Sequence, residues 1–143
     1  MREILFRGKS LKDNEWMEGY YCRYGWTGKE KDYIIPDYAS ALYGVEVESN
    51  TLGQFTGLTD KNGVKIFEGD IVKFKHGGEF DEKGIYYRNY AVEFVNTYVT
   101  YGLRLRNKSI HFPFKKATSS QHEAEVIGNI YDNPELIGGE ADE

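Results

Sequence analysis

Carboxylate and amide side chains gather around two turns in the middle of the sequence, at Asp60, Asn62, Glu68 and Asp70. Such oxygen-bearing groups suit hard metal ions such as Mg²⁺ and Ca²⁺. The spacing does not fit an EF-hand calcium loop, because a loop that starts at Asp60 needs a glycine at its sixth position and Gly63 stands at the fourth. Turn formation explains the whole cluster, and we expect Asp70 to accept backbone hydrogen bonds where the chain bends. A metal-dependent hydrolase that uses Asp60, Glu68 and Asp70 is kept as an alternative function.

Other residue patterns that support catalysis are missing from the sequence. The three histidines, His76, His111 and His122, lie far apart, and none belongs to an HExxH motif. Cys22 is the single cysteine, so neither a disulfide within the chain nor a cysteine-based metal cluster can form. The GxSxG motif of hydrolases, the phosphate-binding P-loop and the glycine fingerprint of dinucleotide-binding proteins are also missing. We therefore expect a protein without catalytic activity, metal site or cofactor.

Basic residues alternate with other side chains along two predicted strands, and tyrosines stand near them. Successive side chains of a strand point to opposite sides, so Lys73 and Lys75 share one face of their strand. Cations beside aromatic rings can hold phosphates and stack bases. Basic residues on outward strand positions also keep sheets soluble and protect their edges, and this structural interpretation stays open. The candidate residues for binding nucleic acid or another partner are Lys73, Lys75, Tyr87, Tyr101, Arg104 and Arg106.

The charge of the chain is unevenly distributed. Its formal net charge of −5 argues against general electrostatic binding to nucleic acid or anionic membranes. Residues 61–116 nevertheless carry a net charge of +5, whereas residues 1–60 carry −3 and residues 117–143 carry −7. Two interpretations are open: a nucleic-acid face shielded by an acidic tail, or two surfaces that neutralise each other.

The elements that must position these residues are centred on residues 54–74. Asp60, Asn62 and Gly63 tolerate tight turns, and apolar residues on both sides predict a β-hairpin. The interruption at 68–70 predicts a bend before the next strand.

Short strands and turns are expected along the rest of the chain. The content of 12 Tyr, 8 Phe and 16 Gly favours such a β architecture over long helices. An N-terminal hairpin is predicted, in which Gly19 permits a bulge or close packing and Trp16 lies in the core. Asn133 and Pro134 predict a brief helix through Leu136, and residues 36–44 stay open between a helical turn and a loop. The predicted strands are 2–7, 16–24, 33–35, 45–48, 71–74, 85–87, 90–95, 101–106, 110–114, an edge strand that contains Pro113, and 126–130.

Three separated blocks of the sequence carry a family resemblance. They are ILFRGK at 4–9 with WMEGY at 16–20, QFTGLTDKNGVKIFEGDIVKF at 54–74, and EVIGNIYDNPEL at 125–136. These blocks resemble the YopX family of proteins encoded by bacteriophages and prophages, and the similarity spans residues 1 to about 137. The resemblance implies an SH3-like β-barrel core and a capacity for self-association. It brings no established activity and no functional residues.

The sequence and the resemblance together predict a mainly β protein with an SH3-like β-barrel or roll core, an N-terminal β-hairpin extension and short helical segments. Residues 1–137 are expected to form a single domain, and residues 138–143 a disordered acidic tail. No window approaches the ~20 apolar residues that span a bilayer, and no secretion signal opens the chain, so we expect a cytoplasmic protein. The expected function is that of a non-enzymatic phage or prophage accessory protein, an interaction module that binds an unknown protein partner and forms homo-oligomers. A nucleic-acid-binding module is the first alternative.

Overall fold

The computed structural model describes residues 4–36, 43–78, 80, 82–95, 100–104, 111–113 and 124–137, with the backbone alone for residues 94–95, 100–104 and 111–113. The chain forms two compact units, Met1–Gly57 and Leu58–Glu143. The single domain expected over residues 1–137 stays a prediction. The expected acidic tail, residues 138–143, lies outside the described residues.

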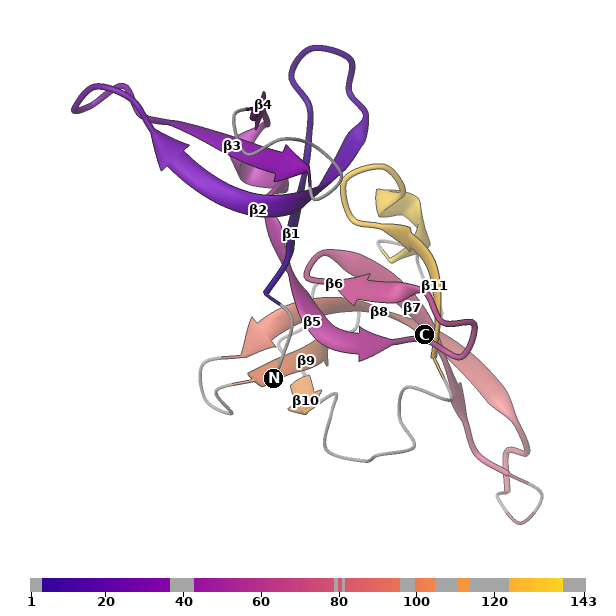
Figure 1. The fold of residues 1–143 in the computed structure, drawn as a ribbon. Coiled ribbons are helices and arrows are strands. Elements are labelled where there is room, and N and C mark those ends of the chain that lie inside the picture. The colour runs from indigo at the N-terminus through magenta and orange to yellow at the C-terminus, as the bar shows by residue number, and fades with distance from the viewer. Residues whose placement is uncertain are drawn as a thin grey trace. The chain divides into compact units, whose positions relative to one another are not determined.

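The first unit begins with the predicted N-terminal hairpin (Figure 1). β1 (Phe6–Lys9) pairs antiparallel with β2 (Trp16–Tyr24), and Lys9 lies opposite Trp16. In the turn between them Asn14 takes a φ of +64°, which asparagine tolerates better than most residues. β2 also pairs with β3 (Lys31–Pro36), and β3 pairs with β4 (Val45–Glu46). The prediction of this hairpin is therefore confirmed.

Gly19 permits a close approach between β2 and β3. A Cβ atom at this position would lie 2.1 Å from the backbone oxygen of Ile35. The pairing of β2 with β3 runs from Gly19 to Tyr24 without a break in register, so close packing and not a bulge explains the glycine. Among the described residues of this unit, the buried hydrophobic side chains are those of Leu5, Ile34, Val47 and Phe55.

Trp16 is half-buried and not part of that core, contrary to expectation. The guanidinium carbon of Arg7 lies 4.6 Å from the centre of the Trp16 ring, and Nζ of Lys9 lies 5.6 Å from it. Trp16 therefore serves as an aromatic partner for two cations on the same face of the hairpin.

Residues 53–76 form the predicted succession of strands and turns. β5 (Gly53–Thr59) is followed by the turn at 60–63, by β6 (Lys65–Phe67) and, after a second turn, by β7 (Asp70–His76). Gly63 and Gly69 take φ values of +83° and +96° in the two turns, a conformation that costs glycine little. The six-stranded sheet has the order β4-β3-β2-β1-β5-β6, and the division between the units falls within β5.

The second unit contains a five-stranded antiparallel sheet with the order β10-β9-β8-β7-β11. Its other strands are β8 (Tyr86–Val95), β9 (Thr100–Arg104), β10 (His111–Pro113) and β11 (Ala124–Asn129). Pro113 lies in the edge strand β10, as predicted. The prediction of two separate strands at 85–87 and 90–95 is wrong. Arg88 and Asn89 pair with Phe74 and Lys73 of β7, so hydrogen bonding across the sheet keeps β8 continuous through these polar residues.

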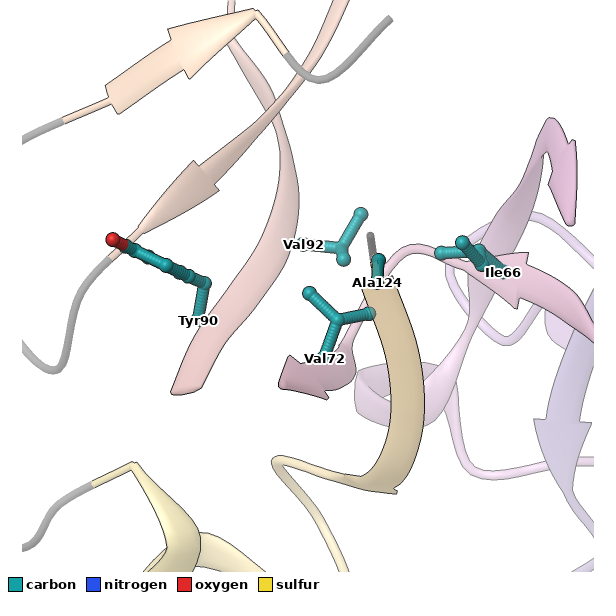
Figure 2. Packing of buried hydrophobic residues seen from close by; sticks show 5 residues of the cluster. All are labelled: Ile66, Val72, Tyr90, Val92 and Ala124. Atoms are coloured by element: carbon teal, nitrogen blue, oxygen red, sulfur yellow. The ribbon is translucent and has the colours of Figure 1, made fainter. Parts of the chain in front are cut away.

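Apolar side chains cover both faces of this sheet. On one face, the buried cluster consists of Ile66, Val72, Tyr90, Val92 and Ala124 (Figure 2), with Leu58, Phe74 and Val126 packed against it. On the other face, Ile71 and Ala91 pack with Ile137, and the neighbouring side chains of Ile127, Ile130 and Leu136 extend this second cluster. Both clusters belong to the second unit.

The mainly β, antiparallel fold is confirmed, but the SH3-like barrel is not: the described strands form two sheets, and no closed barrel is found among them. The described residues contain two short 3₁₀ helices, η1 (Ser49–Thr51) and η4 (Pro134–Leu136). η4 confirms the predicted brief helix, although Asn133 makes no side-chain cap and instead accepts a hydrogen bond from Asn129 N–H at 3.2 Å. In the described part of the chain, no helix has the length and hydrophobicity to cross a membrane.

Candidate functional site

Two carboxylates of the acidic cluster, those of Asp60 and Asp70, bind the backbone. Asp60 accepts hydrogen bonds from the N–H groups of Asn62 at 2.8 Å, Val64 at 2.9 Å and Val126 at 2.9 Å. Asp70, which is 2% exposed, accepts one from Phe67 N–H at 2.7 Å, as expected for a residue at the bend. These contacts support the turn-forming interpretation of the cluster.

Three of the predicted binding residues lie together on the β7–β8 hairpin. Lys75 stands opposite Tyr87 in the register, and Nζ of Lys73 lies 5.0 Å from the centre of the Tyr87 ring. Tyr87 is 53% exposed. We call Lys73, Lys75, Tyr87 and Asn89 the Lys73 face of the hairpin. This face extends from Ile71 and Ala91, and Nδ2 of Asn89 donates a hydrogen bond to the carbonyl of Leu136 at 2.9 Å.

The other predicted binding residues lie on β9 or outside the described residues. β8 lies between β7 and β9, so the two basic strands are not neighbours. In β9, Arg104 stands opposite Ala91, which stands opposite Ile71 of β7, and Tyr101 stands opposite Phe94. Arg106 lies outside the described residues. Of the predicted residues, the structure brings Lys73, Lys75 and Tyr87 together on one hairpin.

The opposite face of the same hairpin carries a row of aromatic residues and an arginine. The register pairs Val72 with Tyr90, Phe74 with Arg88 and His76 with Tyr86, so these side chains share one face. We call Phe74, His76, Tyr86, Arg88 and Tyr90 the aromatic-basic face. It begins at the core, where Phe74 and Tyr90 pack, and continues along the hairpin toward the connecting loop.

His76 is at the centre of this face. Its Nε2 is hydrogen-bonded to the phenol oxygen of Tyr90 at 2.8 Å. Its ring stacks on Tyr86, with 5.2 Å between ring centres and 17° between ring planes, and lies 5.2 Å from the ring of Phe74. In Figure 2 the hydroxyl of Tyr90 points away from the aliphatic side chains of the core. The hydrophobic cluster is therefore bordered, at Tyr90, by a hydrogen bond between two polar groups.

Two cations lie near the Tyr86 ring on this face. The guanidinium carbon of Arg88 lies 5.5 Å from the ring centre and Nζ of Lys83 lies 5.7 Å from it. Burial lowers the pKa of His76, and the positive charge of Arg88 lowers it further, so the imidazole is neutral at pH 7. Burial raises the pKa of Tyr90, which remains a protonated phenol. The face therefore combines fixed positive charge with uncharged groups that can donate hydrogen bonds.

The sequence patterns did not predict the aromatic-basic face, because each pattern of charges and tyrosines belongs to a single strand. Phe74 and His76 alternate with Lys73 and Lys75, and Tyr86 and Arg88 alternate with Tyr87 and Asn89. Within each strand, every second side chain lies on the same face. Only the register of β7 against β8 shows which alternating residues of one strand share a face with which residues of the other.

A second polar network, in the first unit, has a structural role. Asp32 is 3% exposed and accepts hydrogen bonds from Tyr21 Oη at 2.6 Å, from Arg23 Nη1 at 2.9 Å and from the hydroxyl of Ser49. Burial alone raises the pKa of Asp32, but the hydrogen bonds from Ser49, Tyr21 and Arg23 outweigh it and hold that pKa below its usual value. A carboxylate that is stabilised as an anion in this way is a weak base. Its hydrogen bonds join β3 to β2 and to η1, which gives the network its structural role.

The remaining histidines lie on β10 or outside the described residues. His111 belongs to β10, and His122 lies outside the described residues. Within the described residues, no group of three or more histidine, cysteine, aspartate or glutamate side chains is arranged to hold a metal ion.

Comparison with known proteins identifies the family of the chain. No curated protein matches the sequence at a significant level. The crystal structure of protein EF1440 from Enterococcus faecalis is similar to this structure, with a TM-score of 0.52 and 21% sequence identity over 96% of this chain and 99% of that chain. At this identity the likeness concerns the fold alone. The model of the family described as YopX protein matches residues 5–138, which is most of the sequence. The chain therefore belongs to the YopX family.

Proposed function

We propose that this protein is a non-enzymatic accessory protein of a bacteriophage or prophage, which acts in the host cytoplasm by binding another macromolecule through the β7–β8 hairpin. The phage context comes from the resemblance noted in the sequence. The carboxylates Asp60 and Asp70 are occupied by backbone donors, which favours a binding role over the hydrolase alternative.

The exposure of large side chains at the outer end of the hairpin supports this contact surface. Tyr87 and Ile85 are each 53% exposed and Phe80 is 95% exposed. Within the described residues, β9 accompanies β8 only from Ala91 to Val95, so no described strand flanks residues 86–90 of β8 on that side. In Figure 1 this end of the hairpin extends away from β9 and β10. Aromatic side chains that project in this way are frequent anchors of protein interfaces.

Affinity capture of the tagged full-length chain from prophage-induced cells tests the proposal. The wild type is compared with the Ile85→Ser/Tyr87→Ser double variant, and Leu11→Ser serves as the control because Leu11 is 51% exposed in a turn of the first unit. Each capture is made with and without nuclease. We expect one enriched partner that the double variant loses and the control keeps. A partner retained by the double variant would contradict the assignment to the hairpin.

Self-association is a further part of the proposal. The first unit exposes three large aromatic side chains, Tyr20 at 57%, Tyr24 at 72% and Trp26 at 85%. Light scattering across a hundredfold range of protein concentration tests it. We expect an oligomer that Tyr24→Ser/Trp26→Ser converts to a monomer, and a wild type that is monomeric throughout would refute it.

A further inference from the structure

Arg88 holds a positive charge at the middle of the aromatic-basic face, and no described carboxylate neutralises it. Within the described residues no carboxylate forms an ion pair with it, and its contact is with the ring of Tyr86. It stands opposite Phe74 and is half-buried, so its charge is screened by water less than that of an exposed side chain. A half-buried cation of this kind favours a bound anion.

The surroundings of Arg88 provide hydrogen-bonding groups for an oxyanion. Lys83 reaches the same tyrosine ring, and His76 stacks on that ring from the paired position of β7. The groups that face His76 are Tyr86, Tyr90 and Arg88 from β8, and Phe74 from its own strand. None of these is an acid, so nothing described beside His76 opposes an approaching anion.

The Lys73 face is less suited to an anion. Lys73 stands between Asn89 of β8 and Glu125 of β11 in the register, and Glu125 also pairs with Lys61 at 3.8 Å. A carboxylate thus lies beside the cation on that face. Because Arg88 has no described ion-pair partner, the aromatic-basic face is the better candidate for an anion site, although sequence patterns pointed to the other face.

We propose that the aromatic-basic face binds a backbone phosphate of nucleic acid, with Arg88 and Lys83 as the cationic contacts and His76 as a hydrogen-bond donor. This inference rests on the proposed binding role of the β7–β8 hairpin and adds to it a second contact, on the face opposite Tyr87. The acidic residue Glu82 is exposed next to Lys83 in the loop that connects the strands, so we place the phosphate over the strands at Arg88 and His76, where Lys83 reaches it from the loop. Arginine and lysine contacts to phosphate carry affinity without reading sequence.

Fluorescence anisotropy with labelled oligonucleotides tests the site. A 20-nucleotide single strand and the matched duplex are titrated with the full chain at several salt concentrations. Arg88→Gln removes the central charge, and Lys73→Gln removes a charge from the opposite face of the same hairpin as a matched control. We expect Arg88→Gln to weaken binding by about tenfold, the scale of one lost charged hydrogen bond, and to lower the slope of log K against log salt by about 0.7 for the single strand or about 0.9 for the duplex. Lys73→Gln is expected to change neither quantity.

The adjacent tyrosines give a second matched pair. Tyr86 and Tyr87 follow each other in β8 and lie on opposite faces. We expect Tyr86→Ala to weaken binding and Tyr87→Ala to leave it unchanged. Circular dichroism and urea unfolding show whether each variant is folded. The reverse order of effects would overturn the assignment of the face.

The pH dependence of binding reports on His76. Because a bound phosphate favours the imidazolium, proton uptake by His76 accompanies binding, and we expect the affinity to rise as the pH falls from 8 to 5.5. His76→Gln keeps a hydrogen-bond donor but does not titrate, so the rise is expected to be lost in this variant. An equal rise in wild type and variant would overturn the role given to His76.

Failure of this inference differs from failure of the proposed function. If neither oligonucleotide binds at low salt, the nucleic-acid site is refuted, while a nuclease-resistant partner that depends on Ile85 and Tyr87 would still support the interaction module. If both experiments are negative, the hairpin is not the binding surface.

Discussion

Asp60 and Val126 are joined across 66 residues of sequence by a hydrogen bond of 2.9 Å, which Val126 N–H donates to Oδ2 of the carboxylate. The other carboxylate oxygen of Asp60 accepts from Asn62 and Val64 within its own turn. A single buried side chain therefore shapes the turn between β5 and β6 and fastens it to the edge strand β11.

Replacement of Asp60 by alanine is expected to destabilise the second unit. The change leaves three backbone N–H groups without their acceptor, and we expect the free energy of unfolding to fall by about 2–4 kcal/mol. Urea unfolding at pH 7, followed by circular dichroism, measures the change. Asp60→Asn keeps one acceptor oxygen and is expected to fall between wild type and alanine. A loss below about 1 kcal/mol for Asp60→Ala would mean that water replaces the carboxylate at these groups.

A methyl group at position 19 is expected to force β2 and β3 apart. The added Cβ of Gly19→Ala would meet the backbone oxygen of Ile35 at 2.1 Å, and a backbone atom yields less easily than a flexible side chain. We expect a loss of about 2 kcal/mol or more, within the range of overpacking substitutions. Gly78→Ala is the matched control, since nothing lies within 4 Å of its Cβ position. Equal stability of the two variants in urea would contradict the close contact.

The lowered pKa of His76 makes stability depend on pH. The folded state binds a proton less readily than an unfolded histidine, whose pKa is about 6.5. The contribution is therefore complete above about pH 6.5 and is lost as the pH falls from there toward the lower folded pKa. We expect the wild type to lose more stability than His76→Gln between pH 7.5 and 5. Parallel stability curves for the two proteins would show that His76 has the same pKa in both states.

The network around Asp32 is expected to stabilise the first unit when the carboxyl group of Asp32 is ionised. Its folded pKa lies below the unfolded value of about 3.9, so this contribution is present above that pH and is lost as the pH falls through the folded pKa. At pH 7 we expect Asp32→Asn to cost about 1–3 kcal/mol, because Tyr21, Arg23 and Ser49 lose a charged acceptor. Chemical unfolding of both proteins from pH 7 to pH 2 measures the difference, which should shrink at the acid end. A difference in stability that persists unchanged at pH 2 would contradict the stabilisation by ionised Asp32.

Local patterns in the sequence determined the strands, the turns and the family. Asp60, Asn62 and Gly63 favour a tight turn, and Gly69 before Asp70 favours a second one, because glycine takes a positive φ at little cost. Residues 54–74 could therefore be predicted directly as strands and turns. The role of Asp70 at its bend and the edge position of Pro113 followed in the same way. These features depend on neighbours close in the chain.

Tertiary structure alone decided which side chains share a face. Successive side chains of a strand lie on opposite faces, so the sequence alone places Lys73 and Phe74 on different faces of β7. The register of β7 with β8 decides which residues of β8 lie beside each of them. The insertion of β8 between β7 and β9 separated the basic residues that the sequence had grouped. The same register stacked His76 on Tyr86 and placed Arg88 beside them, because pairing between strands is set by the packing of both faces of the sheet and not by the composition of either strand.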